Sequence, residues 1–191
     1  MRMRTFRVLS VAVWIWIAAA SASAGDFTFF VGGDFPGKLS ESIVLGSLSS
    51  YDTVDKSPVY GFRLSTSFVP MVGLEHTLAF SNDYLFPNAN FFTGVTNARG
   101  FIYNSNLIIN FPSKSIVPYA TAGIGLLHQY GSENLPVGTK LAFNYGGGLK
   151  FLHVLGPLGV RFDARGYTST GLKFGGHLNI FELSGGVLLS F

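Results

Sequence analysis

The chain has no cysteine among its 191 residues, and charged residues make up only 12% of it. The lack of cysteine excludes disulfides, thiolate chemistry and cysteine metal sites, so backbone pairing and packing must hold the fold together. Soluble domains carry charge on about a quarter of their residues. We therefore expect part of this protein's surface to face a solvent other than water.

The N-terminal segment has the three parts of a secretory signal peptide. Three arginines in the first seven residues precede an apolar run at 8–20, and the small-x-small pattern from Ala22 to Ala24 predicts cleavage after Ala24. The run is too short for a retained spanning helix, which needs about 20 apolar residues. The sequence predicts a cleavable signal peptide at 1–24 and one mature domain at 25–191.

Removing this segment also removes the excess of positive charge. The whole chain has 13 basic and 10 acidic residues, and three of the basic residues lie in the predicted signal peptide, so ten of each sign remain. A balanced mature chain has no basic surface of the kind that binds nucleic acid. We expect no nucleic-acid partner.

Beyond residue 25 the sequence has no apolar run long enough for a helical membrane span and no helical spacing of apolar residues. Segments of about ten residues with alternating apolar and polar positions recur instead, separated by breaks rich in glycine, proline, asparagine, serine or aspartate. This pattern predicts eight strands near residues 26–34, 58–69, 73–84, 99–111, 117–130, 140–152, 158–168 and 178–191. Each is about as long as the 9 to 11 residues that a tilted strand needs to cross a bilayer.

The breaks between these segments alternate in length. Short breaks lie at 69–72, 112–116 and 153–157, and longer, more polar ones lie at 35–57, 85–98, 131–139 and 169–177. Outer-membrane barrels have short periplasmic turns at one end and longer extracellular loops at the other. The alternation predicts the same two-sided arrangement here.

The two faces of the predicted strands differ in polarity. Within residues 141–151, for example, Phe143 and Tyr145 share one face, and Asn144 and Gly146 share the other. A soluble barrel would turn its apolar face inward and cover its exterior with charge, and this chain has too few charges to do so. The apolar face is therefore expected to contact lipid, and the sheet must close because open edges in hydrocarbon cost several kcal/mol per unpaired group. The predicted fold class is all-β, an eight-stranded antiparallel up-and-down transmembrane β-barrel.

The last predicted strand ends on an aromatic residue and has apolar residues at alternate positions before it. The residues of this face are Phe181, Leu183, Val187, Leu189 and Phe191. Such a strand resembles the C-terminal assembly signal that the barrel-assembly machinery of bacteria recognises.

Together with residues 117–126, 143–151 and 160–167, this strand resembles the small outer-membrane β-barrel domain family, the OmpA/OmpX-like eight-stranded proteins. The resemblance covers essentially the whole mature chain. It implies a location in the bacterial outer membrane, contact with outer-membrane lipid and lipopolysaccharide, and help from periplasmic chaperones and the barrel-assembly machinery. These motifs are specific to the fold and do not identify a function.

Strand alternation places seven charged residues on the lumen face. They are Arg63, Glu75, Lys150, Arg161, Asp163, Arg165 and Glu182. If the last hairpin turns near Leu172, Glu182 lies roughly across from Asp163, and the two neighbouring arginines reach both carboxylates. Buried charges need compensation, so these residues are predicted to form an ion-pair plug in the lumen. A gated pore or proton path, in which the pairs exchange partners, is the alternative.

Histidine and serine near the C-terminus raise the possibility of a lipid A-modifying enzyme. An outer-membrane lipid A deacylase of this size uses serine, histidine and glutamate on its lipid-facing surface, with a His-x-Ser pair. Here Asn179 stands where that serine would follow His177, and neither Ser169, Ser184 nor Glu182 restores the pattern. Without a nucleophile beside the histidine, acyl transfer has no basis. No catalytic residue is predicted.

The remaining histidines are His76, His128 and His153, expected near strand ends or turns with no metal-ligand spacing. No metal site and no cofactor are predicted. The connection at 35–57 is the longest and could contact a surface ligand. We therefore expect a non-enzymatic integral outer-membrane protein that supports envelope integrity or surface interaction, with a small pore and a deacylase-like enzyme as alternatives.

Overall fold

The computed structural model describes residues 25–36, 56–82, 98–111, 113–131, 139–170 and 177–191. The predicted signal peptide at 1–24 and most of the connection at 35–57 lie outside the described residues. Within the described part no helix is long and apolar enough to cross a membrane.

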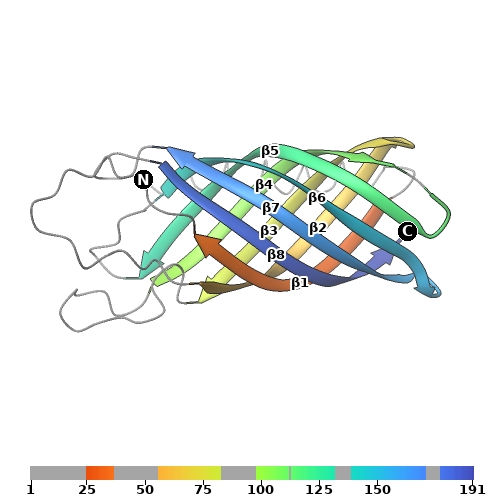
Figure 1. Ribbon diagram of the computed structural model, residues 1–191, viewed down its shortest axis with the longest axis horizontal. Coiled ribbons are helices and arrows are strands. Elements are labelled where there is room, and N and C mark those ends of the chain that lie inside the picture. The colour runs from red at the N-terminus through yellow and green to blue at the C-terminus, as the bar shows by residue number, and fades with distance from the viewer. Residues whose placement is uncertain (1–24, 37–55, 83–97, 112, 132–138, 171–176) are drawn as a thin grey trace, which may run out of the picture.

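Eight strands account for nearly all of the described chain (Figure 1). They are β1 (Gly25–Pro36), β2 (Ser57–Val69), β3 (Val72–Asn82), β4 (Ala98–Asn110), β5 (Ile116–Gly131), β6 (Thr139–Leu155), β7 (Leu158–Thr170) and β8 (His177–Ser190). Each begins and ends within about three residues of its predicted position, because the period-two pattern and the turn residues bound it on both sides.

The strands form one closed barrel in sequence order, with every neighbouring pair antiparallel. β1 closes the sheet against β8, and at the end of that seam the amide of Gly25 donates to the carbonyl oxygen of Phe191 at 2.9 Å. Closure leaves no open sheet edge, as a membrane requires. The predicted fold class is confirmed.

The two ends of the barrel differ. The short turns after β2 and β6 lie at the same end as Phe191, and the connections after β1, β3, β5 and β7 leave the opposite end (Figure 1). We call these the short-turn end and the long-connection end.

Side chains alternate between the lumen and the exterior along each strand. In β2, for example, buried Val59, Gly61 and Arg63 alternate with exposed Tyr60 and Phe62. The exterior is covered by exposed aromatic and aliphatic side chains, and most charged and amide side chains of the strands are buried inside. Exposed ones, such as Asn82 and Arg99, lie at strand ends. This distribution is the inverse of a soluble barrel and matches a protein whose outer solvent is lipid.

Glycines on the lumen face make room for large side chains. At Gly148 an added Cβ would lie 2.5 Å from the hydroxyl oxygen of Tyr119. The lack of a side chain on β6 therefore allows a tyrosine from β5 to lie across the lumen.

Candidate functional site

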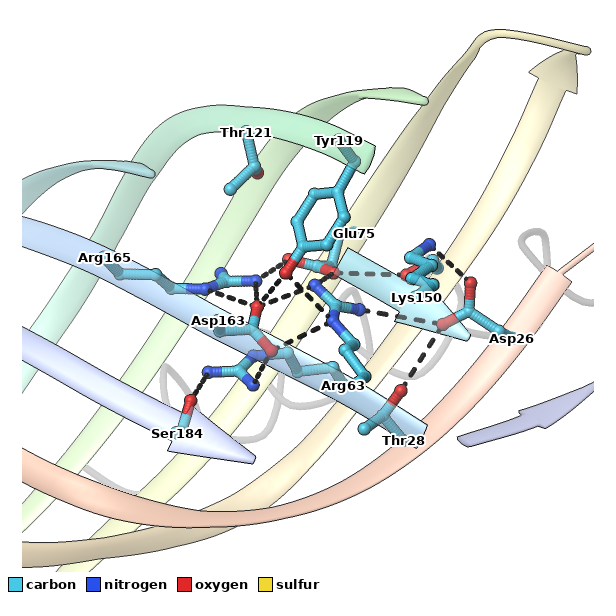
Figure 2. Close-up of polar contacts among 12 residues, drawn as sticks. Asp26, Thr28, Arg63, Glu75, Tyr119, Thr121, Lys150, Asp163, Arg165 and Ser184 are labelled. Atoms are coloured by element: carbon cyan, nitrogen blue, oxygen red, sulfur yellow. Dashed lines mark hydrogen bonds and ion pairs between the residues drawn. The ribbon is translucent and has the colours of Figure 1, made fainter. Parts of the chain in front are cut away.

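The lumen contains a network of buried ion pairs (Figure 2). The three arginines and three carboxylates at its centre have side chains with no exposed surface. They come from β2, β3, β7 and β8, so the network joins opposite walls of the barrel. All seven lumen charges singled out from the sequence belong to it or to the pair beside it.

Asp163 on β7 is the centre of this network. Its carboxylate accepts hydrogen bonds from Arg63 across the lumen at 3.0 Å, from Arg161 at 3.0 Å and from Arg165 at 2.9 Å. The hydroxyl of Tyr119 donates to the same carboxylate. The single negative charge of Asp163 thus balances part of the positive charge of three guanidinium groups. Two further carboxylates balance the rest.

Glu75 and Glu182 flank this centre. Glu75 pairs with Arg161 and Arg165 at 2.6 Å each and accepts a hydrogen bond from Ser65 at 3.2 Å. Both oxygens of Glu75 are therefore occupied by charge-assisted bonds.

Glu182 holds the other side of the network. It accepts from Arg63 at 2.5 Å, from Ser184 at 2.7 Å and from Tyr167 at 2.8 Å. The ring of Phe30 lies under the Arg63 guanidinium at 3.6 Å, so this cation is held by two carboxylates and one aromatic face.

Lys150 extends the network toward the short-turn end through Asp26 of β1, whose carboxylate also lies 3.7 Å from the guanidinium of Arg161. The Lys150 ammonium lies 2.7 Å from the carboxylate of Asp26 and 5.3 Å from the centre of the Tyr119 ring. Neither Asp26 nor Tyr119 was predicted from the sequence to lie in this site. The signal was available for Asp26, which is an acidic residue one step inside β1 on its lumen face.

One pairing expected from the sequence is wrong. Asp163 lies opposite Ser184, and Glu182 lies opposite Arg165. The register of the last hairpin is therefore displaced by two residues on β8 from the one that a turn near Leu172 implied. The displacement keeps Glu182 on the lumen face, because strand faces repeat every two residues, and it brings Glu182 to Arg63 instead of to Asp163.

A ring of apolar side chains closes the lumen a second time. One buried residue from each strand contributes to it: Phe30, Val59, Ala79, Ile102, Leu127, Ala142, Tyr167 and Ile180. On each strand that contributes to the ion-pair network, the ring residue lies closer to the long-connection end than the network residues do. One further buried carboxylate, Asp34 of β1, lies beyond the ring toward that end. The ring was not predicted from the sequence, although Phe30, Val59 and Ile102 interrupt the polar face there.

A cavity of about 410 Å³ opens at the short-turn end. Its lining includes the Lys150–Asp26 pair, Asn110, Ser67 and His153. From this end inward the lumen thus contains an open vestibule, the ion-pair network and the apolar ring.

The residues of the predicted assembly signal all point outward. Phe181, Leu183, Val187, Leu189 and Phe191 are between 42 and 61% exposed. Their apolar row is available to lipid or to another protein, and its recognition by the assembly machinery remains a prediction.

The ingredients of the lipid A deacylase alternative lie apart. Ser184 donates to Glu182 inside the lumen, and Ser169, also buried, donates to the carbonyl oxygen of Leu141. The side chain of His177 lies outside the described part. A deacylase of the expected kind needs its serine and glutamate on the lipid-facing surface. Ser169, Ser184 and Glu182 are buried instead.

His76 was expected near a strand end and lies instead in the middle of β3, on its outer face. It is 2% exposed, its Nδ1 lies 3.1 Å from the hydroxyl of Tyr103, and the two rings stack. Within the described ranges no three histidine or acidic side chains are placed to hold a metal ion.

No protein-family model matches the chain, and no curated protein matches it. Solved structures do match. Neisserial surface protein A (NspA) is 14% identical, with 88% of this chain and 97% of that chain covered and a TM-score of 0.63. The attachment invasion locus protein Ail of Yersinia pestis is 11% identical, with 88% and 99% covered and a TM-score of 0.52.

The outer membrane enzyme PagL is also similar, at 16% identity, with 86% of this chain and 98% of that chain covered and a TM-score of 0.50. At these identities the likeness concerns the fold alone. The chain has the fold of the small eight-stranded outer-membrane β-barrels, as the sequence resemblance implied. Because this fold includes both surface proteins and an enzyme, it does not by itself select a function.

Proposed function

We propose that this protein is an integral outer-membrane barrel without enzymatic activity and without a conducting pore, which supports envelope integrity or surface interaction. The observation that carries the proposal is the double closure of the lumen by the ion-pair network and the apolar ring. An eight-stranded barrel has an interior just wide enough for side chains to fill, and here two layers of side chains fill it.

The remaining parts of the proposal concern export and partners. The segment at 1–24 directs export and is removed, and the outward row on β8 engages the barrel-assembly machinery after delivery by periplasmic chaperones. The connection at 35–57 is available for a surface ligand at the long-connection end. The exposed apolar exterior supports residence in a lipid bilayer.

Conductance measurements test the closed lumen. The mature chain, refolded and inserted into planar bilayers, is expected to produce no unitary currents under applied voltage. Reproducible unitary currents from the homogeneous folded protein would favour the pore alternative and overturn the proposal.

Mass spectrometry of lipid A tests the absence of enzymatic activity. Cells that produce the protein and cells that lack it are expected to have the same lipid A acylation pattern. A lost or added acyl chain that depends on the protein would show that it modifies lipid.

A further inference from the structure

The lumen of the described barrel contains charged side chains of both signs, but its outer surface contains exposed charged side chains of one sign only. Every described acidic side chain is buried in the lumen: Asp26, Asp34, Glu75, Asp163 and Glu182. The exposed charged residues of the same ranges are all cationic, namely Lys56, Arg99 and Lys114. The exterior of the described barrel therefore presents positive charge only, which suits an anionic partner.

Arg99 has a defined setting among these cations. It lies at the start of β4, at the long-connection end, and points outward because its neighbour Gly100 is buried on the lumen side. The strand register places Asn82 of β3 beside it on one flank and Tyr130 of β5 on the other. All three side chains are exposed. A guanidinium, an amide and a phenol thus form one lateral row across three adjacent strands.

Aromatic side chains lie directly below this row. Phe101 follows Arg99 on the same face of β4, and its ring packs against Phe80 with the centroids 5.4 Å apart. Tyr130 stacks on His128 at 5.7 Å. Aromatic belts of this kind mark the level of the lipid headgroups in membrane barrels. The row Asn82–Arg99–Tyr130 is therefore at the height where a lipid's polar group meets its acyl chains.

The donors of this row suit a phosphate. Arginine presents a planar fork of N–H groups that matches phosphate oxygens with two parallel bonds. The amide and the phenol each add a neutral donor beside it. No described acidic side chain lies on the outer surface to compete for the guanidinium.

We propose that the row Asn82–Arg99–Tyr130 binds the phosphate group of an outer-leaflet lipid, with the acyl chains lying along the aromatic surface below. This inference rests on the outer-membrane location in the proposed function. Lys56, at the start of β2 on the same end and 5.4 Å from the ring of Phe35, adds positive charge to the same rim.

Native mass spectrometry of the full mature barrel in detergent micelles tests this site, with purified lipopolysaccharide as the probe. The wild-type protein is expected to retain the lipid. Arg99→Gln is expected to bind it about five- to tenfold more weakly, because the loss of one cation near the membrane surface reduces affinity by about this factor. Arg99→Lys keeps the charge and loses the fork, so intermediate binding is expected. Chemically dephosphorylated lipopolysaccharide is expected to bind wild type and Arg99→Gln equally.

Lys114→Gln is the matched control, because Lys114 is an exposed cation at the short-turn end, where β4 joins β5. This variant has the same change in net charge and is expected to bind as the wild type does. Equal losses in the two variants, or undiminished binding by Arg99→Gln, would overturn the site. Heat-dependent gel migration shows whether each variant is folded. The conductance and lipid A measurements above do not involve Arg99, so failure of the site and failure of the proposed function are distinguishable.

Discussion

At the scale of single residues, Asp163 is the most consequential side chain of the lumen. It receives hydrogen bonds from three arginines and a tyrosine, and all of these groups are buried. Buried ion pairs contribute little net stability when complete, because desolvation offsets the attraction. Their removal is costly because the remaining charges are left without compensation.

Substitution Asp163→Ala is therefore expected to lower the free energy of unfolding by about 3–5 kcal/mol. Reversible urea unfolding in lipid vesicles measures this change. Lys114→Ala, which removes an exposed charge, is the control and is expected to have little effect. Similar stability of Asp163→Ala and wild type would mean that the arginines find other partners or water.

Gly148 is a residue at which the lumen depends on close packing. An alanine there would place its Cβ 2.5 Å from the Tyr119 hydroxyl, so Gly148→Ala is expected to cost about 1–3 kcal/mol of stability through overpacking. Gly33→Ala is the matched control, because its Cβ would meet Phe35 at 3.5 Å, an ordinary contact. Thermal unfolding monitored by circular dichroism compares the two, and equal losses would contradict the packing argument.

At the scale of the strand, alternation decides which solvent each residue meets. On β8, Leu183 is exposed to the outside, and its neighbours Glu182 and Ser184 are buried in the lumen. A one-residue slip in the register of β8 would turn two polar side chains toward lipid and a leucine into the ionic network. The hydrophobic exterior therefore excludes registers that differ by an odd number of residues. The contacts inside the lumen select among the registers that differ by an even number.

The lipid-facing assignment of β8 predicts a depth-dependent effect of charge. Leu183→Arg, near the middle of the strand, is expected to destabilise the inserted barrel by about 2–4 kcal/mol, and Asn179→Arg, near the long-connection end, by about 0–1 kcal/mol. Urea unfolding in vesicles measures both. Equal effects at the two positions would show that β8 does not cross the hydrocarbon layer as assigned.

At the scale of the whole molecule, the lumen has two closures of different chemistry in series. The ion-pair network would admit water if its pairs were removed, and the apolar ring would still present a dry layer of one side chain from each strand. We therefore expect either closure alone to block ions.

This arrangement predicts that single disruptions remain silent in conductance measurements. Asp163→Ala and Phe30→Ser are each expected to give no unitary currents in planar bilayers, and the double variant is expected to conduct. Gel migration before insertion establishes that each protein is folded. Currents from either single variant would show that the other closure does not block ions.

The class of the barrel and the orientation of its faces follow from the amino-acid sequence. Period-two alternation, breaks of alternating length and a shortage of charge are local properties, and each survives in the folded protein because every strand meets lipid on one side and the lumen on the other. They were enough to place Arg63, Glu75, Lys150, Arg161, Asp163, Arg165 and Glu182 inside.

Which of these residues contact one another depends on the closed barrel as a whole. Arg63 and Asp163 are 100 positions apart on strands that are not neighbours, and their contact depends on the width of the closed barrel and the stagger of its strands. The same closure brings Asp26 to Lys150, sets Glu182 against Arg63 and gathers eight separate apolar residues into one ring. Local patterns do not encode these contacts, because they arise from the summed register of all eight strand pairs.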